Sequence, residues 1–229
     1  MRTLAVAEAT LREIARRRSV LVLLLVIPLA FYLARRGTEW WQGLRFMVMG
    51  VGWAMSTAAL FAGNGARAIE PRLRISGYAA RHLWLGQLLA LWTVGAAVSV
   101  PYWVLVRVDL PQVRSGAMAL ILALTVLIAA PFGLGISALL PRELEGMLVL
   151  LTVLAMQTVL APEARAGQAL PFWFAREIGV YAVESDAGAD HLTKGLTHAA
   201  VAAVILLAAV AVLSGLRLRR RRHLRLSAA

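Results

Sequence analysis

The sequence predicts an all-α integral membrane protein, with six transmembrane helices preceded by an amphipathic helix in the membrane interface. Hydrophobic residues make up 60% of the chain and the mean hydropathy is +0.73, whereas a soluble domain is about 45–50% apolar. The apolar residues also form blocks about as long as a bilayer is thick. Because no internal repeat or linker separates these blocks, residues 1–229 are expected to form a single transmembrane domain.

The charge of the chain has the sign of a nucleic-acid-binding protein, but its distribution favours a membrane protein. The formal net charge is +12, and Lys194 is the only lysine among 24 cationic residues. The arginines gather at the ends of the apolar blocks, where they set topology and contact membrane lipids, so no nucleic acid partner is expected. A chain without cysteine has no disulfide, thiol catalyst or cysteine metal site.

Residues 3–18 predict the amphipathic helix. Apolar residues recur there at spacings of three and four and form one stripe, which consists of Leu4, Ala7, Leu11 and Ile14. Arg12 and Arg16 lie among the polar residues and are expected to face lipid headgroups. The alternative is a signal peptide, but no small-x-small cleavage site closes the apolar block that follows.

The apolar blocks predict spans at 19–34, 46–62, 83–106, 117–140, 147–161 and 198–216. The first is short and contains Pro28, which is tolerated where neighbouring helices re-satisfy the freed carbonyl group. Small residues from Gly50 to Ser56 suit close helix packing in the second. Tryptophans mark both ends of the third, as at membrane surfaces, and Pro131 predicts a kink in the fourth. The fifth span is the shortest, and the sixth precedes an arginine-rich tail.

Positive charge differs between alternating loops and predicts the orientation. The N-terminus, the loops after the second and fourth spans, and the tail together hold 16 of the cationic residues, and the other loops hold 8. The excess of positive charge on cytoplasmic loops then places both termini in the cytoplasm. Residues 162–195, the longest polar stretch, become an outer loop with an aromatic patch followed by an acidic run.

The sequence offers little for chemistry within the membrane. It has no GxxxxGK[ST] motif for binding ATP. The four histidines lie in four different places and form no metal-binding motif. Gly135, Ile136 and Ser137, with His198, faintly resemble the serine–histidine pair of rhomboid-type intramembrane proteases, but Ala138 stands where that family has glycine. The chain is therefore expected to be no enzyme and to hold no cofactor or metal.

The segment after the second span, residues 70–87, is short and basic, and it predicts a docking loop. Pro71 is suited to the first turn of a helix, Glu70 favours a helix start through the helix dipole, and Gly77 can end the helix. The segment would offer a cytoplasmic partner the side chains of Glu70, Arg72, Leu73, Arg74, Ile75, Ser76, Gly77 and Tyr78. The alternative is a loop whose arginines only touch lipid headgroups.

The layout of the whole chain resembles the membrane subunit of an ATP-binding cassette (ABC) exporter of the type-2 permease class. The resemblance is closest from Glu70 to Tyr78 and at Leu85, Gly86, Gln87 and Leu88, although Pro71 and Arg72 replace the family's commoner Glu-x-Gly-Thr sequence after Glu70. The outer region containing Pro162, Pro171, Phe172 and Trp173 resembles the partly re-entrant segment that these permeases carry before the last span.

This resemblance implies a permease subunit in a bacterial plasma membrane, driven through the 70–78 loop by a separate ATPase subunit that binds ATP and magnesium. It also implies a dimer with a second permease subunit, identical or paralogous, which forms the substrate path. The first and fifth spans are expected to face each other across that dimer. Two rival interpretations remain open from the sequence: an ATP-independent small-molecule carrier, and a membrane scaffold or immunity protein.

Overall fold

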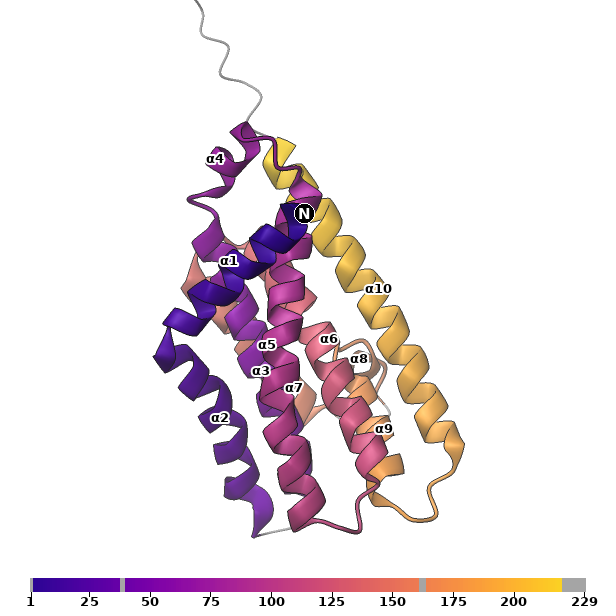
Figure 1. Ribbon diagram of the computed structural model, residues 1–229. Coiled ribbons are helices and arrows are strands. Elements are labelled where there is room, and N and C mark those ends of the chain that lie inside the picture. The colour runs from indigo at the N-terminus through magenta and orange to yellow at the C-terminus, as the bar shows by residue number, and fades with distance from the viewer. Residues whose placement is uncertain (1, 38–39, 161–163, 220–229) are drawn as a thin grey trace, which may run out of the picture.

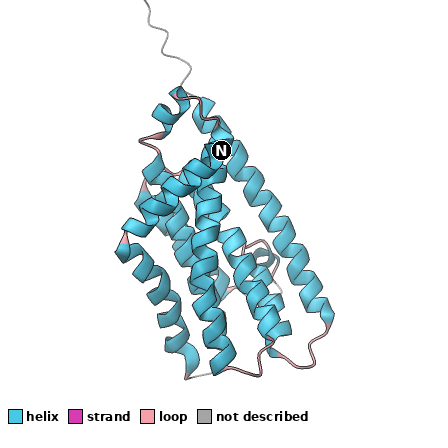
Figure 2. Ribbon diagram, in the orientation of Figure 1, coloured by secondary structure: helices cyan, strands magenta, loops and turns pink. Residues whose placement is uncertain are grey.

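The computed structural model describes residues 2–37, 40–160 and 164–219, and all regular secondary structure within them is helical (Figures 1 and 2). The helices are α1 (Arg2–Arg16), α2 (Arg18–Arg36), α3 (Trp40–Ala66), α4 (Glu70–Ile75), α5 (Ala80–Asp109), α6 (Ser115–Leu139), α7 (Glu143–Val159), α8 (Arg165–Gln168), α9 (Trp173–Val183) and α10 (Ala189–Arg219). Pro162 and the tail arginines from Arg220 onward lie outside the described residues.

Five helices, α2, α3, α5, α6 and α10, are long and apolar enough to cross a membrane. They confirm an all-α protein of the multi-pass membrane type. The predicted fifth span corresponds to α7, which has 17 residues and a length of about 25 Å at 1.5 Å per residue. A transmembrane helix needs about 20 residues, so the sixth crossing stays a prediction.

The helices extend beyond the apolar blocks that predicted them. α3 begins at Trp40 rather than at residue 46, so Arg45 lies inside the helix and not in the preceding loop. α10 begins at Ala189, nine residues before the predicted span. Much of the predicted outer loop, 162–195, is therefore helical, since it holds α8, α9 and the first turns of α10. Backbone hydrogen bonds stabilise a helix in polar surroundings as well as in apolar ones, so hydropathy marks only its apolar middle.

The centre of the bundle is the contact between α3 and α6. Their backbones touch where small residues face each other: a Cβ added at Gly133 would overlap the carbonyl oxygen of Ser56, and one added at Gly63 would overlap the hydroxyl of Ser137. Around this contact the core is formed by fully buried Met47, Met55, Leu91, Met118, Ile121 and Leu122. Small residues at such contacts give membrane helices the close approach on which their van der Waals association depends.

The two ends of the bundle differ in what they carry. The N-terminus, α4 and the last turn of α10 lie at one end, here called the terminal end (Figure 1). At the opposite end, Asp109 at the close of α5 accepts hydrogen bonds from Tyr32 and Arg36 of α2. Arg114, just before α6, donates to the carbonyl oxygen of Tyr181 at 2.9 Å and so attaches α9 there.

Candidate functional site

Residues 70–78, which the sequence predicts to be a docking loop and which are here called the coupling segment, form the short helix α4 and its C-terminal turn. Gly77 has φ +82°, a left-handed conformation that glycine adopts without steric cost. Its N–H donates to the carbonyl oxygen of Arg74, and the N–H of Tyr78 donates to that of Leu73 at 3.0 Å. This pair of bonds is the Schellman motif, which ends a helix and turns the chain away from its axis. The predicted end of the helix at Gly77 is confirmed.

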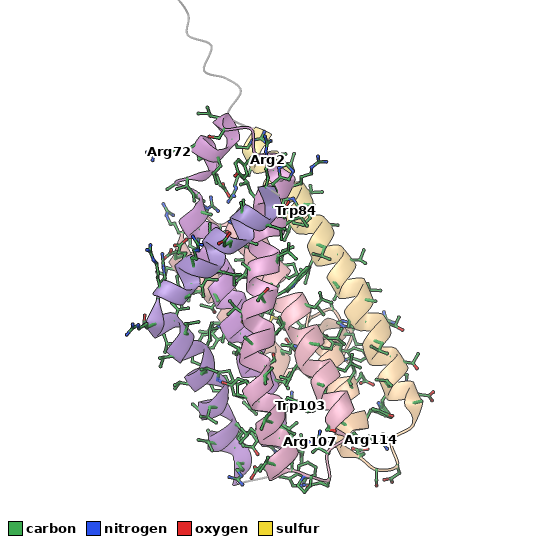
Figure 3. All side chains as sticks on the ribbon, in the orientation of Figure 1. Arg2, Arg72, Trp84, Trp103, Arg107 and Arg114 are labelled. Carbon is green, nitrogen blue, oxygen red and sulfur yellow. The ribbon has the colours of Figure 1, made fainter. Side chains whose placement is uncertain are left out.

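α4 offers a basic and partly apolar surface at the tip of the terminal end (Figure 3). Arg72 and Arg74 are exposed, and the Ile75 side chain is 88% exposed. Leu73 and Tyr78 are half-buried. Ile75 is thus an exposed apolar side chain beside the two exposed arginines.

Glu70 attaches α4 to the end of α10. Its side chain is buried, and one of its carboxylate oxygens accepts a hydrogen bond from the Nη2 of Arg217. The side chains of Glu70 and Arg217 are only 8% and 21% exposed, so water screens this ion pair much less than the surface pairs of α1. This ion pair therefore links α4 directly to the last turns of α10.

Arg67 attaches the turn before α4 to the end of α6. Its guanidinium donates to the carbonyl oxygens of Ser137 and Leu140, which α6 leaves unpaired at its C-terminus. Burial lowers the pKa of Arg67 below its ordinary value, and the nearby charge of Arg217 lowers it further, whereas Glu70 raises it. The turn before α4, the end of α6 and the last turns of α10 thus meet around the charged side chains of Arg67, Glu70 and Arg217.

α1 is the third element bound to the coupling segment. Arg2 donates to the carbonyl oxygen of Gly77, and its guanidinium lies 5.8 Å from the centre of the Tyr78 ring. α1 packs directly on α5, because a Cβ added at Gly86 would lie only 2.6 Å from the Cβ of Val6. Gly86 belongs to the Leu85–Leu88 sequence that resembles the type-2 permeases, and its lack of a side chain allows α1 to pack closely on α5.

The buried face of α1 differs in part from the predicted stripe. Ala7 and Ile14 are buried and Leu11 is half-buried, whereas Leu4 is 66% exposed. Arg12 and Arg16 are exposed, and Arg12 pairs with Glu8 at 2.5 Å. The face turned to α5 is centred on Val6 and Ala7, so Leu4 remains free to contact lipid.

The aromatic patch of the outer region enters the bundle. The ring of Phe172 lies 6.1 Å from that of Phe132 in α6 and closely approaches Gly52, the thirteenth residue of α3. Phe172 therefore reaches near the middle of α3, whereas α9, which follows it, runs towards the opposite end (Figure 1). Trp173 packs on His198 of α10, with 5.2 Å between the ring centres. Pro171 lies in the turn that precedes Phe172 and Trp173, and it is half-buried.

The serine and histidine considered for an intramembrane protease are not brought together. Gly135, two residues before Ser137, faces Val210 of α10. His198 lies twelve residues before Val210 along the same helix, about 18 Å away at 1.5 Å per residue. Its Nε2 instead contacts the carbonyl oxygen of Gln168 at 2.9 Å.

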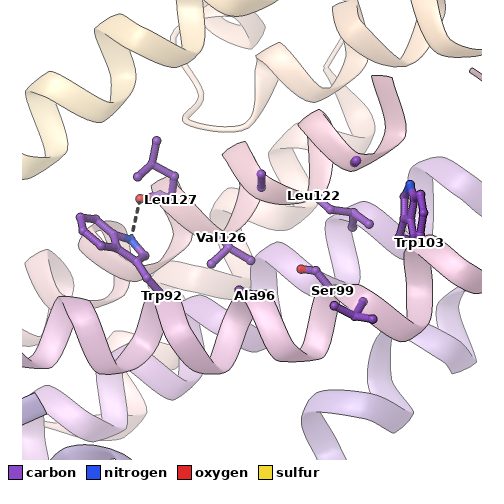
Figure 4. Close-up of a pocket in the computed structure, with 10 residues that line it drawn as sticks. Trp92, Ala96, Ser99, Trp103, Leu122, Val126 and Leu127 are labelled. Atoms are coloured by element: carbon purple, nitrogen blue, oxygen red, sulfur yellow. Dashed lines mark hydrogen bonds between the residues drawn. The ribbon is translucent and has the colours of Figure 1, made fainter. Parts of the chain in front are cut away.

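Two of the hollows in the described part of the chain are large enough to hold a ligand. One is an open apolar groove of about 480 Å³ between α5 and α6 (Figure 4). Trp92 and Trp103 flank it, and the Nε1 of Trp92 donates to the carbonyl oxygen of Leu127 at 3.3 Å. Its lining has no charged side chain, so it can select only by shape and apolarity. The second is lined by Arg45 and lies among α3, α7 and α9.

No protein-family model matches this sequence, and no curated protein matches it significantly. A functional assignment therefore depends on the architecture and contacts of the chain itself.

Proposed function

We propose that this chain is the membrane-spanning permease subunit of an ATP-binding cassette exporter. A separate ATPase subunit, which binds ATP and magnesium, docks on the coupling segment and drives the movement of the spans. The observation that carries the proposal is α4: a short helix at the tip of the terminal end, with exposed Arg72, Arg74 and Ile75. The excess of arginine at the terminal end supports a cytoplasmic location for it, in a bacterial plasma membrane.

The attachments of α4 support a role in transmitting force. The segment from Arg67 to Tyr78 contacts α10 through Arg217, the end of α6 through Ser137, and α1 through Arg2. A loop that only balanced lipid charge would need none of these contacts. A partner that pushes α4 would move the ends of the helices with it.

A dimer with a second permease subunit, identical or paralogous, completes the proposal. α2 and α7 both pack on α3 and leave apolar faces outward. Exposed residues on these two faces include Val22, Leu23, Val26, Leu33, Leu144, Leu148, Leu151 and Val159. These faces would meet across the dimer and enclose the substrate path between them. A crosslinking scan in which α2 contacts lipid alone would argue against this arrangement.

The first test is co-purification. The tagged protein is purified in mild detergent from its native host, and mass spectrometry identifies its partners. We expect a P-loop ATPase near one-to-one stoichiometry. Replacement of Arg72 and Arg74 by glutamate should abolish co-purification of the ATPase, because both arginine side chains are exposed on the surface of α4 where the partner would dock.

The matched control is Arg142→Glu, which reverses an exposed arginine at the terminal end outside the coupling segment. This variant should retain the ATPase. Absence of any ATPase, under conditions that preserve a known permease–ATPase complex, would overturn the proposal in favour of a carrier or a scaffold.

A further inference from the structure

A cavity of about 750 Å³ lies at the opposite end of the bundle, among α3, α6, α7, α8 and α9. This volume falls within the range of small-molecule sites, about 300–1,000 Å³. Most of its wall is apolar, and the apolar lining includes Trp41, Leu44, Val48, Leu160, Phe172 and Val180. The wall therefore suits an alkyl chain.

A positive charge stands in this apolar wall. Arg45 of α3 lines the cavity and is half-buried, and its Nη2 donates to the carbonyl oxygen of Gln157 at 3.3 Å. Among the described residues no carboxylate pairs with Arg45. A neutral carbonyl group satisfies one donor of the guanidinium but leaves its charge uncompensated, and a partly buried charge favours an anion beside it.

The two other charged residues of the lining fit an anion near Arg45. Arg176 of α9 contributes a second guanidinium to the cavity, and Glu184 lines it from an exposed position at the end of α9. Glu184 can thus be solvated where it stands. The cavity thus combines the guanidinium of Arg45 with a mostly apolar wall, which is the complement of an anionic amphiphile.

The position of Arg45 along α3 corresponds to the depth of a lipid headgroup. α3 has 27 residues and a length of about 40 Å, and the hydrocarbon core of a bilayer is about 30 Å thick. Arg45 is the sixth residue of α3, so it lies about 8 Å from the helix start by the same rise. This places it near the boundary between headgroups and hydrocarbon if α3 crosses the membrane symmetrically.

We propose that this cavity binds an amphiphile with one anionic headgroup, a carboxylate or a phosphate monoester, and a single alkyl chain. Arg45 binds the headgroup, and the apolar wall formed by residues such as Val48 and Phe172 encloses the first part of the chain. The residues named for this site all come from one chain, and the site does not depend on an ATPase partner.

The test compares three probes on the purified full-length protein in a neutral detergent. Dodecyl phosphate carries both features of the ligand, dodecyl maltoside carries the same chain on a neutral headgroup, and inorganic phosphate carries the anion alone. A ligand that binds only the folded state raises the thermal unfolding midpoint, and above its dissociation constant the rise grows with the logarithm of the ligand concentration. We expect such a concentration-dependent rise with dodecyl phosphate and none with the other two probes. Phosphatidylglycerol and phosphatidylcholine, compared in the same way, show whether a two-chain membrane lipid is also accepted.

Two variants test the cavity by independent means. Arg45→Gln removes the charge and should weaken dodecyl phosphate binding at least tenfold. Gly179→Leu leaves Arg45 in place and fills the cavity, because Gly179 lines the cavity and an added Cβ there meets no atom within 4 Å. It should also weaken binding at least tenfold without destabilising the protein. Arg107→Gln, an exposed arginine at the same end but outside the cavity, should bind within twofold of the wild type.

Equal responses to dodecyl phosphate and dodecyl maltoside would overturn the proposal, since they would show a site for any alkyl chain. A response to inorganic phosphate alone would replace it with a simple anion site. Stronger binding of phosphatidylglycerol than of dodecyl phosphate would likewise replace the single-chain ligand with a lipid of the surrounding leaflet. Unchanged binding in both Arg45→Gln and Gly179→Leu would place the site elsewhere.

Discussion

At the scale of single residues, the buried carboxylate of Glu70 is expected to stabilise the terminal end through its ion pair with Arg217. Removal of one partner from a buried ion pair costs about 3–5 kcal/mol, because the remaining charge is left without compensation. We expect Glu70→Gln to lower the free energy of unfolding by about 3 kcal/mol, since Arg217 would lose its partner while still largely buried. Detergent-mediated equilibrium unfolding measures this change.

The control for Glu70 is Glu13→Gln, which breaks an exposed pair with Arg17 whose side chains are more than half exposed. Such pairs contribute about 0–1 kcal/mol. The swapped variant Glu70→Arg with Arg217→Glu should recover part of the loss. A loss for Glu70→Gln no larger than that for Glu13→Gln would show that the buried pair is not stabilising.

Gly133 tests the contact between α3 and α6. A methyl group at this position would overlap the carbonyl oxygen of Ser56, so Gly133→Ala must force the two backbones apart. We expect a loss of about 1–3 kcal/mol, the usual cost of overpacking. Gly135→Ala on the same helix is the control, because its Cβ would meet only Val210 at 3.7 Å. It should be neutral or stabilising by up to about 1 kcal/mol, because alanine is the better helix former. Equal effects of the two changes would contradict close packing at Gly133.

Few of these individual contacts could be predicted from the sequence. The exposed arginines of α4 and the helix end at Gly77 were predictable, because both follow from local chemistry. The partner of Glu70 was not, since Arg217 lies 147 residues away and nothing local to either residue indicates the other. Hydropathy predicts a loop at Arg45, because it places a charged residue outside a span, whereas the helix continues through this residue.

At the scale of elements, α1 is held by a close approach that depends on one glycine. Gly86→Leu would place a side chain where Val6 and Thr3 of α1 now lie. We expect α1 to detach from α5 and its exposed arginines, including Arg12, to be cleaved by trypsin at least tenfold faster. Helical segments that pack on their neighbours resist proteolysis because cleavage requires local unfolding.

Gly116→Leu is the matched control for α1, because an added Cβ at Gly116 meets nothing within 4 Å. Its cleavage rate should equal that of the wild type. If Gly86→Leu remains folded by circular dichroism and is cleaved at the wild-type rate, α1 is not held by this contact.

Hydropathy located all the long helices but not their ends. The apolar middles of α2, α3, α5, α6 and α10 correspond to predicted spans, because a membrane requires a continuous apolar stretch. The first turns of α10 are polar, and Gly195 within them packs against Ile178 of α9 instead of ending the helix. The fold of α8 and α9 depends on such tertiary contacts, which no periodicity in a single sequence reveals.

At the scale of the whole molecule, the arrangement of the loops makes a prediction that single thiols can test. The chain has no cysteine, so each introduced cysteine is the only reactive group for a maleimide that cannot cross membranes. We expect Gln112→Cys and Asp186→Cys to react in intact cells. Ser76→Cys and Arg142→Cys should react only after permeabilisation, because they lie at the terminal end.

The same experiment decides whether α7 crosses the membrane. α7 joins Arg142 at the terminal end to the region that precedes Asp186 at the opposite end. The same accessibility at both of these positions in intact cells, whether both react or neither does, would show that α7 does not cross. Reaction at Ser76 and Arg142, but not at Gln112 and Asp186, would reverse the orientation inferred from arginine.

The contacts of the terminal end have a mechanical consequence. Glu70 joins α4 to α10, Arg67 joins the turn before α4 to the end of α6, and Gly135 brings α6 against Val210 of α10. These three links form a closed set of contacts among α4, α6 and α10. We therefore expect a displacement of α4 to move the ends of α6 and α10 together, while the close contact of Gly133 with the backbone of Ser56 holds the middle of α6 against α3.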